Sequence, residues 1–133
     1  ERGNILIATL STQSAAKTIN RIIDVFPLEH QAEIRTRLSL TLKVVVSQTL
    51  LRRIDGPGRV CAREVMFVNS PISNLIREGK VHQINNAIAT HYRDGMMLLD
   101  DALLSFYEQG VVDYVDVVTR IQDPEKMKGL KRR

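Results

Sequence analysis

The feature that most constrains the fold of this sequence is an apolar run, Ile5 to Leu10, that leads through small hydroxyl residues into a helical pattern. A strand that is apolar along its length needs cover on both faces, as a central parallel strand of an α/β sheet has. Because few residues precede this strand, we expect its neighbours to come from outside these 133 residues. The run therefore predicts the back part of a larger α/β domain. The following helix is marked by Ala15, Ile19, Ile22, Ile23 and Phe26 and ends at Pro27.

A second helix and a β-hairpin are expected next. Helical periodicity fits Leu28 to about Val46. Two segments rich in β-favouring residues, 48–54 and 60–68, then flank the turn-forming sequence Asp55-Gly56-Pro57-Gly58. The proline excludes the usual two-residue Asp-Gly turn, so we expect a longer hairpin loop.

From Ser70 onward the sequence is helical in pattern. Ser70 is a favourable N-cap, Pro71 a favourable first helical residue and Gly79 a favourable stop. Further helices are expected at about 82–92, at 96–109 with Gly110 as its stop, and at 114–121 with Asp113 as its cap. Regular structure is expected to end at Asp123-Pro124.

The positive charge of the chain is concentrated at its C-terminal end. The net charge is +4, from 19 basic and 15 acidic side chains. Five of the basic ones are Lys126, Lys128, Lys131, Arg132 and Arg133, so residues 1–125 carry one more acidic than basic side chain. A basic tail on a nearly neutral body is weak support for polynucleotide binding. We expect this tail to be solvated and partly disordered, and we expect no nucleic-acid partner.

The sequence also lacks several kinds of site. No apolar run approaches the ~20 residues that cross a bilayer, and the single Cys61 cannot form an internal disulfide, which favours a reducing cytosol. There is no G-x-x-x-x-G-K-S/T phosphate loop, and Gly56 and Gly58 lie in the hairpin rather than before a helix. Asp100 and Asp101 are adjacent, so on a helix they point in different directions and are not expected to form a catalytic pair.

Four separated stretches carry a common resemblance to a known family. They are residues 9–27, 46–52, 74–80 and 95–110. In this order they resemble the segment after the His box, the next strand, the second half of the AIRNLIRE motif and the following Gly-Met-x-x-Leu-Asp helix of PilT-type ATPases. These ATPases are the retraction motors of type IV pili in twitching motility, within the larger group of secretion ATPases. The resemblance covers residues 1 to about 124 without a gap.

The resemblance implies a fold, an activity and partners. The expected fold is α/β, the C-terminal portion of a RecA-like P-loop ATPase domain, with one sheet strand, a β-hairpin and a C-terminal helical bundle. Residues 1–69 would belong to the ATPase core, 70–124 to the helical subdomain and 125–133 to the basic tail. The family hydrolyses ATP with Mg²⁺ by phosphoryl transfer to water, and the Walker A and B segments would lie upstream, so the chain alone is expected to be inactive. The resemblance implies assembly as a homohexamer. The other implied partners are the inner-membrane platform protein of the pilus machine and a paralogous retraction ATPase. The implied location is the cytoplasm, peripheral to the inner membrane.

Functional residues can be placed by the same resemblance. The family's His-box histidine falls on Ser11, which can hydrogen-bond but cannot carry a proton near neutral pH as imidazole does. Ser11 and Thr12 follow the predicted strand at its C-terminal end, where α/β folds place ligands. Together with Arg21 they are expected near the nucleotide or a subunit interface. No metal ligand is expected within the chain, and among catalytic residues only the Ser11 position is considered.

The retraction motif of the family falls on a short amphipathic helix. It comprises Asn74, Leu75, Ile76, Arg77 and Glu78, and its implied role is to relay nucleotide state to the pilus machine. The first half of the motif is not kept, since Pro71 and Ser73 stand in place of its Ala and first Arg. Residues 70–72 and 105–108 resemble the PilU-type paralogues, so the subtype stays open.

Two other classes of function fit the residues without the resemblance. The chain could be a non-enzymatic helical module that binds another protein, in which case Leu75 and Ile76 are core residues and their charged neighbours are solvated. It could also bind nucleic acid through the basic tail. A Walker A motif upstream in the same reading frame would distinguish the motor from both.

Overall fold

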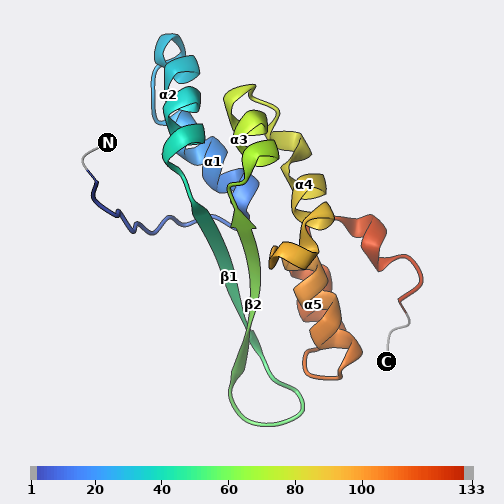
Figure 1. Ribbon diagram of the computed structural model, residues 1–133. Helices are drawn as coiled ribbons and strands as arrows, with labels where there is room; N and C mark the ends of the chain where they lie inside the picture. The colour runs from blue at the N-terminus through green and yellow to red at the C-terminus, as the bar shows by residue number, and fades with distance from the viewer. Residues whose placement is uncertain (1–2, 131–133) are drawn as a thin grey trace.

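A long antiparallel hairpin forms the centre of the fold, and helices pack along it (Figure 1). The computed structural model describes residues 3–130. Strands β1 (Val44–Arg52) and β2 (Arg59–Phe67) pair in register from Val44 with Phe67 to Arg52 with Arg59. The predicted hairpin is therefore confirmed, with a loop longer than two residues, although β1 begins four residues earlier than Gln48.

Helix α1 (Ala15–Asp24) is present as predicted, whereas α2 (Leu28–Thr41) is shorter than its periodicity suggested. The prediction that α2 continues to Val46 is wrong, because the backbone becomes extended at Leu42. The β-branched run that follows crowds a helix but packs well on a pleated sheet. That run begins β1.

The prediction of a strand at Ile5 to Leu10 is wrong for this structure. Residues 4–10 have no regular secondary structure, and Ile5, Leu6 and Ile7 are 93%, 88% and 89% exposed. In Figure 1 this dark-blue segment runs away from the hairpin and the helices. A strand satisfies its backbone hydrogen bonds through a neighbouring strand, and the two strands of the described sheet pair with each other. The segment therefore lacks the partners that a central strand requires.

Helix α3 (Ser70–Arg77) begins at an asparagine cap. Asn69 Oδ1 accepts a hydrogen bond from Ile72 N at 3.1 Å, and the Asn69 backbone is extended. The prediction that Ser70 is the cap is thus wrong by one residue, because Asn69 has the backbone and the side-chain oxygen that an N-cap needs. Gly79 follows α3 with φ 72°, as predicted for a left-handed stop.

The remaining chain forms short helices. They are η1 (Val81–Gln83), α4 (Ile84–Thr90), η2 (Tyr92–Asp94), α5 (Leu99–Glu108), α6 (Tyr114–Arg120) and η3 (Pro124–Met127), where η denotes a 3-10 helix. The helix predicted at 82–92 is thus α4 with a 3-10 turn on each side. The helix predicted from Met96 begins only at Leu99, because Met97 pairs with Val65 of β2 through two backbone hydrogen bonds of 2.9 and 3.0 Å. η3 lies where regular structure was expected to end.

Local signals set the ends of the last helices. Gly110 has φ 71° after α5, and the Asp113 side chain accepts a hydrogen bond from the first residue of α6, as predicted. In the basic tail, Lys126 pairs with Asp101 at 2.6 Å and Lys128 pairs with Glu125. The last three tail residues, 131–133, lie outside the described part of the chain, so the prediction of a disordered tail is not tested there.

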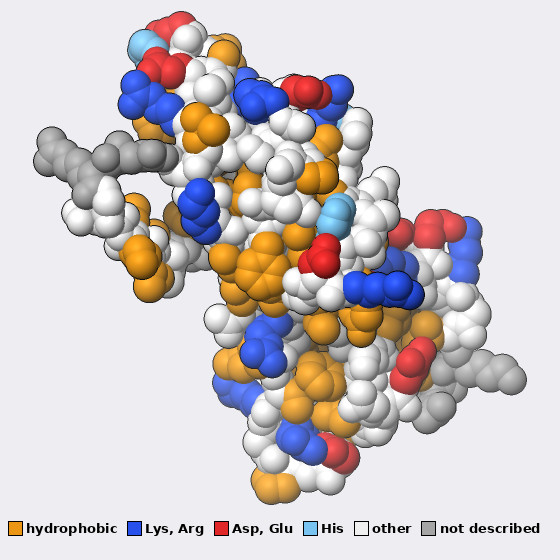
Figure 2. All heavy atoms as spheres, viewed as in Figure 1, with side chains coloured by type: hydrophobic (Ala, Val, Ile, Leu, Met, Phe, Trp, Pro, Cys, Tyr) orange, Lys and Arg blue, Asp and Glu red, His pale blue; other side chains and the backbone are white. Residues whose placement is uncertain are grey.

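Two apolar clusters form the core on the inner face of the hairpin. One cluster packs α1 against α3 and α4 through residues that include Ile19, Ile72 and Ile88. The other packs α5 and α6 against the distal half of the hairpin through residues that include Leu51, Leu103 and Val117. Figure 2 shows further apolar side chains on the surface between the upper and lower parts of the molecule. On the outer face of β1, Val44, Val46 and Leu50 are 45%, 49% and 58% exposed.

The left-handed backbone at Gly79 yields a stability prediction. A side chain in this region costs about 1–2 kcal/mol, and the nearest atom to an added Cβ, Arg35 Nε at 3.5 Å, leaves enough space for it. We expect Gly79→Ala to lower the free energy of unfolding by about 1 kcal/mol in urea titrations. Gly56→Ala is the control, because Gly56 has no positive φ and no atom within 4 Å of the added Cβ. Equal effects of the two changes would contradict this account.

Candidate functional site

Helix α1 has one buried face and one polar face. Ala15 and Ile19 are fully buried, and Ile23 is 2% exposed. On the opposite face four polar residues recur at intervals of three and four, the spacing that brings side chains together on a helix. They are Lys17, Asn20, Arg21 and Asp24.

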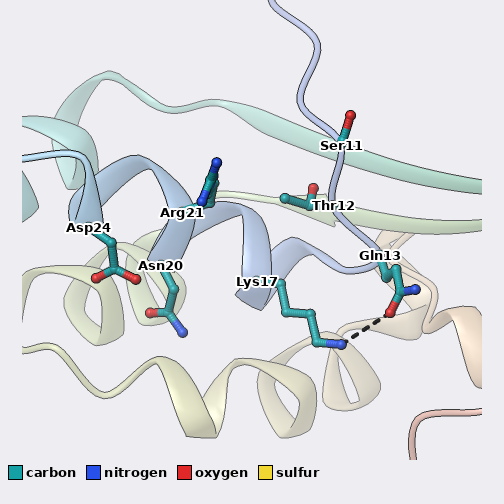
Figure 3. Close-up of a pocket in the computed structure, with 7 residues that line it drawn as sticks. All are labelled: Ser11, Thr12, Gln13, Lys17, Asn20, Arg21 and Asp24. Carbon is teal, nitrogen blue, oxygen red and sulfur yellow. Dashed lines mark hydrogen bonds between the residues drawn. The ribbon is translucent and has the colours of Figure 1, made fainter.

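The polar face of α1 and the segment before it line a shallow surface hollow of about 390 Å³. Ser11, Thr12 and Gln13 contribute its other wall, and Figure 3 shows all seven residues around it. The structure thus brings together Ser11, Thr12 and Arg21, the three residues predicted from the sequence to lie near a nucleotide or an interface.

Short-range hydrogen bonds fix the shape of this hollow. Ser14 caps α1 by accepting a hydrogen bond from Lys17 N at 3.1 Å. The hydroxyl groups of Thr12 and Thr18 lie 2.6 Å apart, and Lys17 Nζ donates to Gln13 Oε1 at 3.2 Å, the dashed line in Figure 3. These contacts hold residues 12 and 13 against the first turn of α1.

The hollow has the chemistry of a binding surface. Lys17 and Arg21 supply two positive charges and Asp24 one negative charge, and Arg21 forms no ion pair with the described residues. No nucleophile in the hollow is paired with a base. Within residues 3–130, no group of three or more His, Cys, Asp or Glu side chains could hold a metal ion. The cationic side chains of Lys17 and Arg21 can therefore contact an anionic group.

A second hollow of about 500 Å³ adjoins the first. The two share Thr12, Gln13 and Lys17. The second extends past Gln48 and Thr49 of the hairpin to residues 119–123, which comprise the end of α6 and the residues after it. Thr12 and Gln13, immediately before α1, thus share a hollow with the hairpin and with the end of α6.

The predicted retraction motif lies on α3, and none of its residues lines either hollow. Ile76 is fully buried and Leu75 is half-buried, whereas Asn74, Arg77 and Glu78 are exposed. Arg77 donates to Asn74 Oδ1. Glu78 forms an ion pair with Lys80 at 2.7 Å, which lowers the pKa of the Glu78 carboxyl group.

Helix α1 connects the hollow with α3. Its buried face shares one apolar cluster with Ile72 and Ile76 of α3, while its polar face lines the hollow. Because a close-packed core transmits strain, a displacement of α1 at the hollow is expected to shift the buried side chains of α3.

A buried carboxylate that sequence reasoning missed holds this region together. Glu64 of β2 is only 1% exposed, and its two oxygens accept hydrogen bonds from Ala15 N at 2.7 Å and from Leu99 N at 3.1 Å. Burial raises the pKa of Glu64, with a smaller contribution from Asp100, while the two backbone donors and Lys126 act in the opposite direction. Period-two alternation places Glu64 on the same face as Ala62 and Met66, a signal that could have identified it as buried.

Asp100 ties the residues after α6 to α5. Its two carboxylate oxygens accept hydrogen bonds from Gln122 N and Asp123 N, each at 2.9 Å. Asp101 points elsewhere and pairs with Lys126. The two carboxylates thus have different partners, as expected for adjacent positions on a helix.

Comparison with known proteins places the chain in a family, although no family model matches it. It is 41% identical over 127 residues to a twitching motility protein of Neisseria gonorrhoeae. It is also 44% identical over 125 residues to the type IV pilus retraction ATPase PilT of Pseudomonas aeruginosa. These matches cover 96% and 94% of the chain. This chain belongs to the PilT-like ATPase family. The type IV pilus ATPase PilU of P. aeruginosa, at 36% identity over 119 residues, shows that the PilT-like relatives include both subtypes.

Solved structures confirm the fold predicted for a PilT-like chain. The crystal structure of the pilus retraction motor PilT with bound ADP matches 91% of the chain at 35% identity, with a TM-score of 0.78. The Legionella pneumophila ATPase DotB matches 81% of the chain at 20% identity and a TM-score of 0.63, which supports the fold alone. The chain spans 34% and 36% of the length of its two relatives and 33% of the PilT chain. It therefore corresponds to about a third of a PilT-like protein.

The buried Glu64 yields a prediction of pH dependence. Because its pKa is raised in the folded state, Glu64 contributes most to stability below its unfolded pKa of about 4.3. That contribution is lost as the pH rises through the window up to the folded pKa. We therefore expect the free energy of unfolding of the wild type, relative to Glu64→Gln, to fall as the pH is raised from about 4, as measured by urea titration.

Glu78→Gln is the control of opposite sign. The pKa of Glu78 is lowered by Lys80, so its small contribution is present above the unfolded pKa and lost as the pH falls. A wild-type advantage over Glu64→Gln that grows with rising pH would contradict the assignment of burial as the dominant cause.

Proposed function

We propose that this chain is part of a hexameric motor ATPase that powers type IV pilus retraction by hydrolysing ATP. The observation that carries the proposal is the 44% identity to a PilT retraction ATPase over 94% of the chain, in the fold of a solved PilT motor. Within the described residues, no helix combines the length and apolar character that a membrane span requires. We place the motor in the cytoplasm, peripheral to the inner membrane.

The residues of this chain do not provide a complete nucleotide site. The sequence has no phosphate loop, and residues 3–130 hold no group of side chains suited to Mg²⁺. ATP and Mg²⁺ would therefore be held mainly by residues outside this sequence. The role of Ser11, Thr12 and Arg21 is to face the nucleotide or the adjoining subunit across the hollow, where their hydroxyl and guanidinium groups can bind anionic oxygen atoms.

The retraction motif has a different role in this proposal. The motif lies away from the hollow: Asn74, Leu75, Ile76 and Arg77 form the last turn of α3, and Glu78 is its C-cap. Its exposed polar groups are available to a partner. Ile76 belongs to the same apolar cluster as the buried residues of α1, so a movement of α1 can displace the motif. The partners in this account are five further copies of the motor, the inner-membrane platform protein of the pilus machine and a paralogous retraction ATPase.

The domain division follows the same proposal. Residues 1–69 would complete the RecA-like core, 70–124 would form the C-terminal helical subdomain and 125–133 the basic tail. The uncovered apolar side chains of the segment before α1 support this division, because a core strand of the intact motor would be covered on both faces.

The first test is ATP turnover. We expect the 133-residue chain alone to show no hydrolysis above background, because the groups that cradle and polarise the phosphates are absent from its sequence. The intact polypeptide that contains it should hydrolyse ATP in a phosphate-release assay. Robust turnover by the chain alone, or none by the intact polypeptide, would contradict the proposed motor.

The second test separates hydrolysis from retraction. In the intact polypeptide we expect Asn74→Ala combined with Leu75→Ala to impair pilus retraction while hydrolysis stays measurable, because α3 lies outside the hollow. Leu104→Ala is the control for lost packing, since Leu104 is also half-buried but lies in the other apolar cluster. Retraction is followed by twitching motility and hydrolysis by phosphate release. Normal twitching in the double variant would remove the role assigned to the motif.

A further inference from the structure

One side chain joins three parts of the chain that are distant in sequence. Glu64 lies 49 residues from Ala15 and 35 residues from Leu99, yet its carboxylate binds the backbone N–H group of both. Each is the first residue of its helix, α1 and α5. The first N–H groups of a helix have no acceptor within the helix, so one carboxylate on β2 satisfies both helix ends at once.

The two helices belong to different parts of the core. Ala15 lies in the apolar cluster with α3 and α4, whereas Leu99 lies in the cluster with α6 and the distal hairpin. Glu64 is therefore a polar link between two separately packed units. The N-terminal ends of both helices favour a negative charge, which offsets part of the cost of burying a carboxylate.

A second link runs in parallel between the same two regions. Gln122 Nε2 donates to the backbone carbonyl of Gln13 at 3.0 Å, and Gln122 N donates to Asp100 Oδ1 of α5 at 2.9 Å. The segment that lines the hollow is thus tied to α5 at its Gln13 end through an exposed contact and at Ala15 through a buried one. The buried contact is the stronger constraint, because a hydrogen bond to a charged group in a water-excluded site is stronger than an exposed neutral one.

We propose that Glu64 is a positioning residue that couples the segment lining the hollow, through the first turn of α1, to α5 of the C-terminal helices. The inference rests on the proposed function, in which Ser11 and Thr12 face the nucleotide or the adjoining subunit, and it takes the nucleotide as the group that displaces them. A displacement of this segment moves Ala15 N, and the Glu64 carboxylate carries the movement to Leu99 N because neither donor has another acceptor in its helix.

The experiment uses the intact polypeptide and measures amide hydrogen exchange with and without Mg²⁺ and ADP. In the wild type we expect ADP to change the protection of residues 11–15 and of α5 by about fivefold or more, the lower end of typical coupling between sites. Glu64→Gln keeps the side-chain volume but replaces one of the two oxygens by an NH2 group, which faces one of the two N–H donors and cannot accept from it. The change at residues 11–15 should persist in this variant, and the change in α5 should disappear.

Asp100→Asn is the matched control. Asp100 is also buried, at 6% exposed, and also accepts two backbone hydrogen bonds, but neither comes from α1. This variant should lose stability and still show the ADP effect in α5. A general loss of packing would abolish the effect in both variants and overturn the inference.

A second variant keeps the inference testable if Glu64→Gln does not fold. Ala15→Pro removes the N–H donor at the first position of α1, where proline is tolerated, and the extended backbone of Ser14 suits a following proline. In this variant, too, the ADP-dependent change in the amide protection of α5 should disappear.

The coupling is overturned if ADP still changes the protection of α5 in either Glu64→Gln or Ala15→Pro. It is also overturned if ADP changes the protection of the wild type at residues 11–15 alone. No wild-type response at residues 11–15 contradicts instead the nucleotide role assigned to the hollow, and the coupling with it.

Discussion

The arrangement of helices around the hairpin depends on one buried carboxylate that serves two helix ends. Ala15 and Leu99 donate to opposite oxygens of Glu64, at 2.7 and 3.1 Å, and thereby fix where α1 and α5 begin against β2. A buried backbone N–H group without an acceptor costs free energy comparable to a lost hydrogen bond. The backbone of the neighbouring residue Val65 also pairs with Met97, two residues before α5 begins. Strand β2 therefore holds the start of α5 at two points, Met97 and Leu99. The burial of Glu64 raises its pKa, which is the physical cost of using a charged group for this purpose.

Around this centre the chain separates binding from packing on the two faces of α1. The polar face and the preceding residues form a hollow with two cationic side chains and two hydroxyl groups, and the apolar face enters the core beside α3. One ten-residue helix thus carries both a polar face that lines the hollow and an apolar face that packs against Ile72 and Ile76 of α3.

The uncovered apolar surface agrees with a chain that spans about a third of its relatives. Ile5, Leu6 and Ile7 are almost fully exposed, and the outer face of β1 carries three half-exposed apolar side chains. At ~25 cal/mol per Å² of apolar area, several such side chains represent a few kcal/mol of burial that is not realised in this structure. The largest error of the sequence analysis, the strand at Ile5 to Leu10, has the same origin. Its apolar pattern predicts a strand that needs neighbouring strands, and the described residues contain no strand that pairs with it.

The sequence by itself determined the local elements and the family. The Asp113 cap, the stops at Gly79 and Gly110 and the hairpin are read from residues only a few positions apart, where sterics and backbone hydrogen bonding decide the outcome. Only the tertiary structure decided what Glu64 does. Alternation along β2 could place it on the inner face, but its partners lie 49 and 35 residues away and are backbone groups, which leave no signature in the sequence. The end of α2 at Thr41 was decided in the same way, because the β-branched residues that follow it gain more from pairing with β2 than from another helical turn.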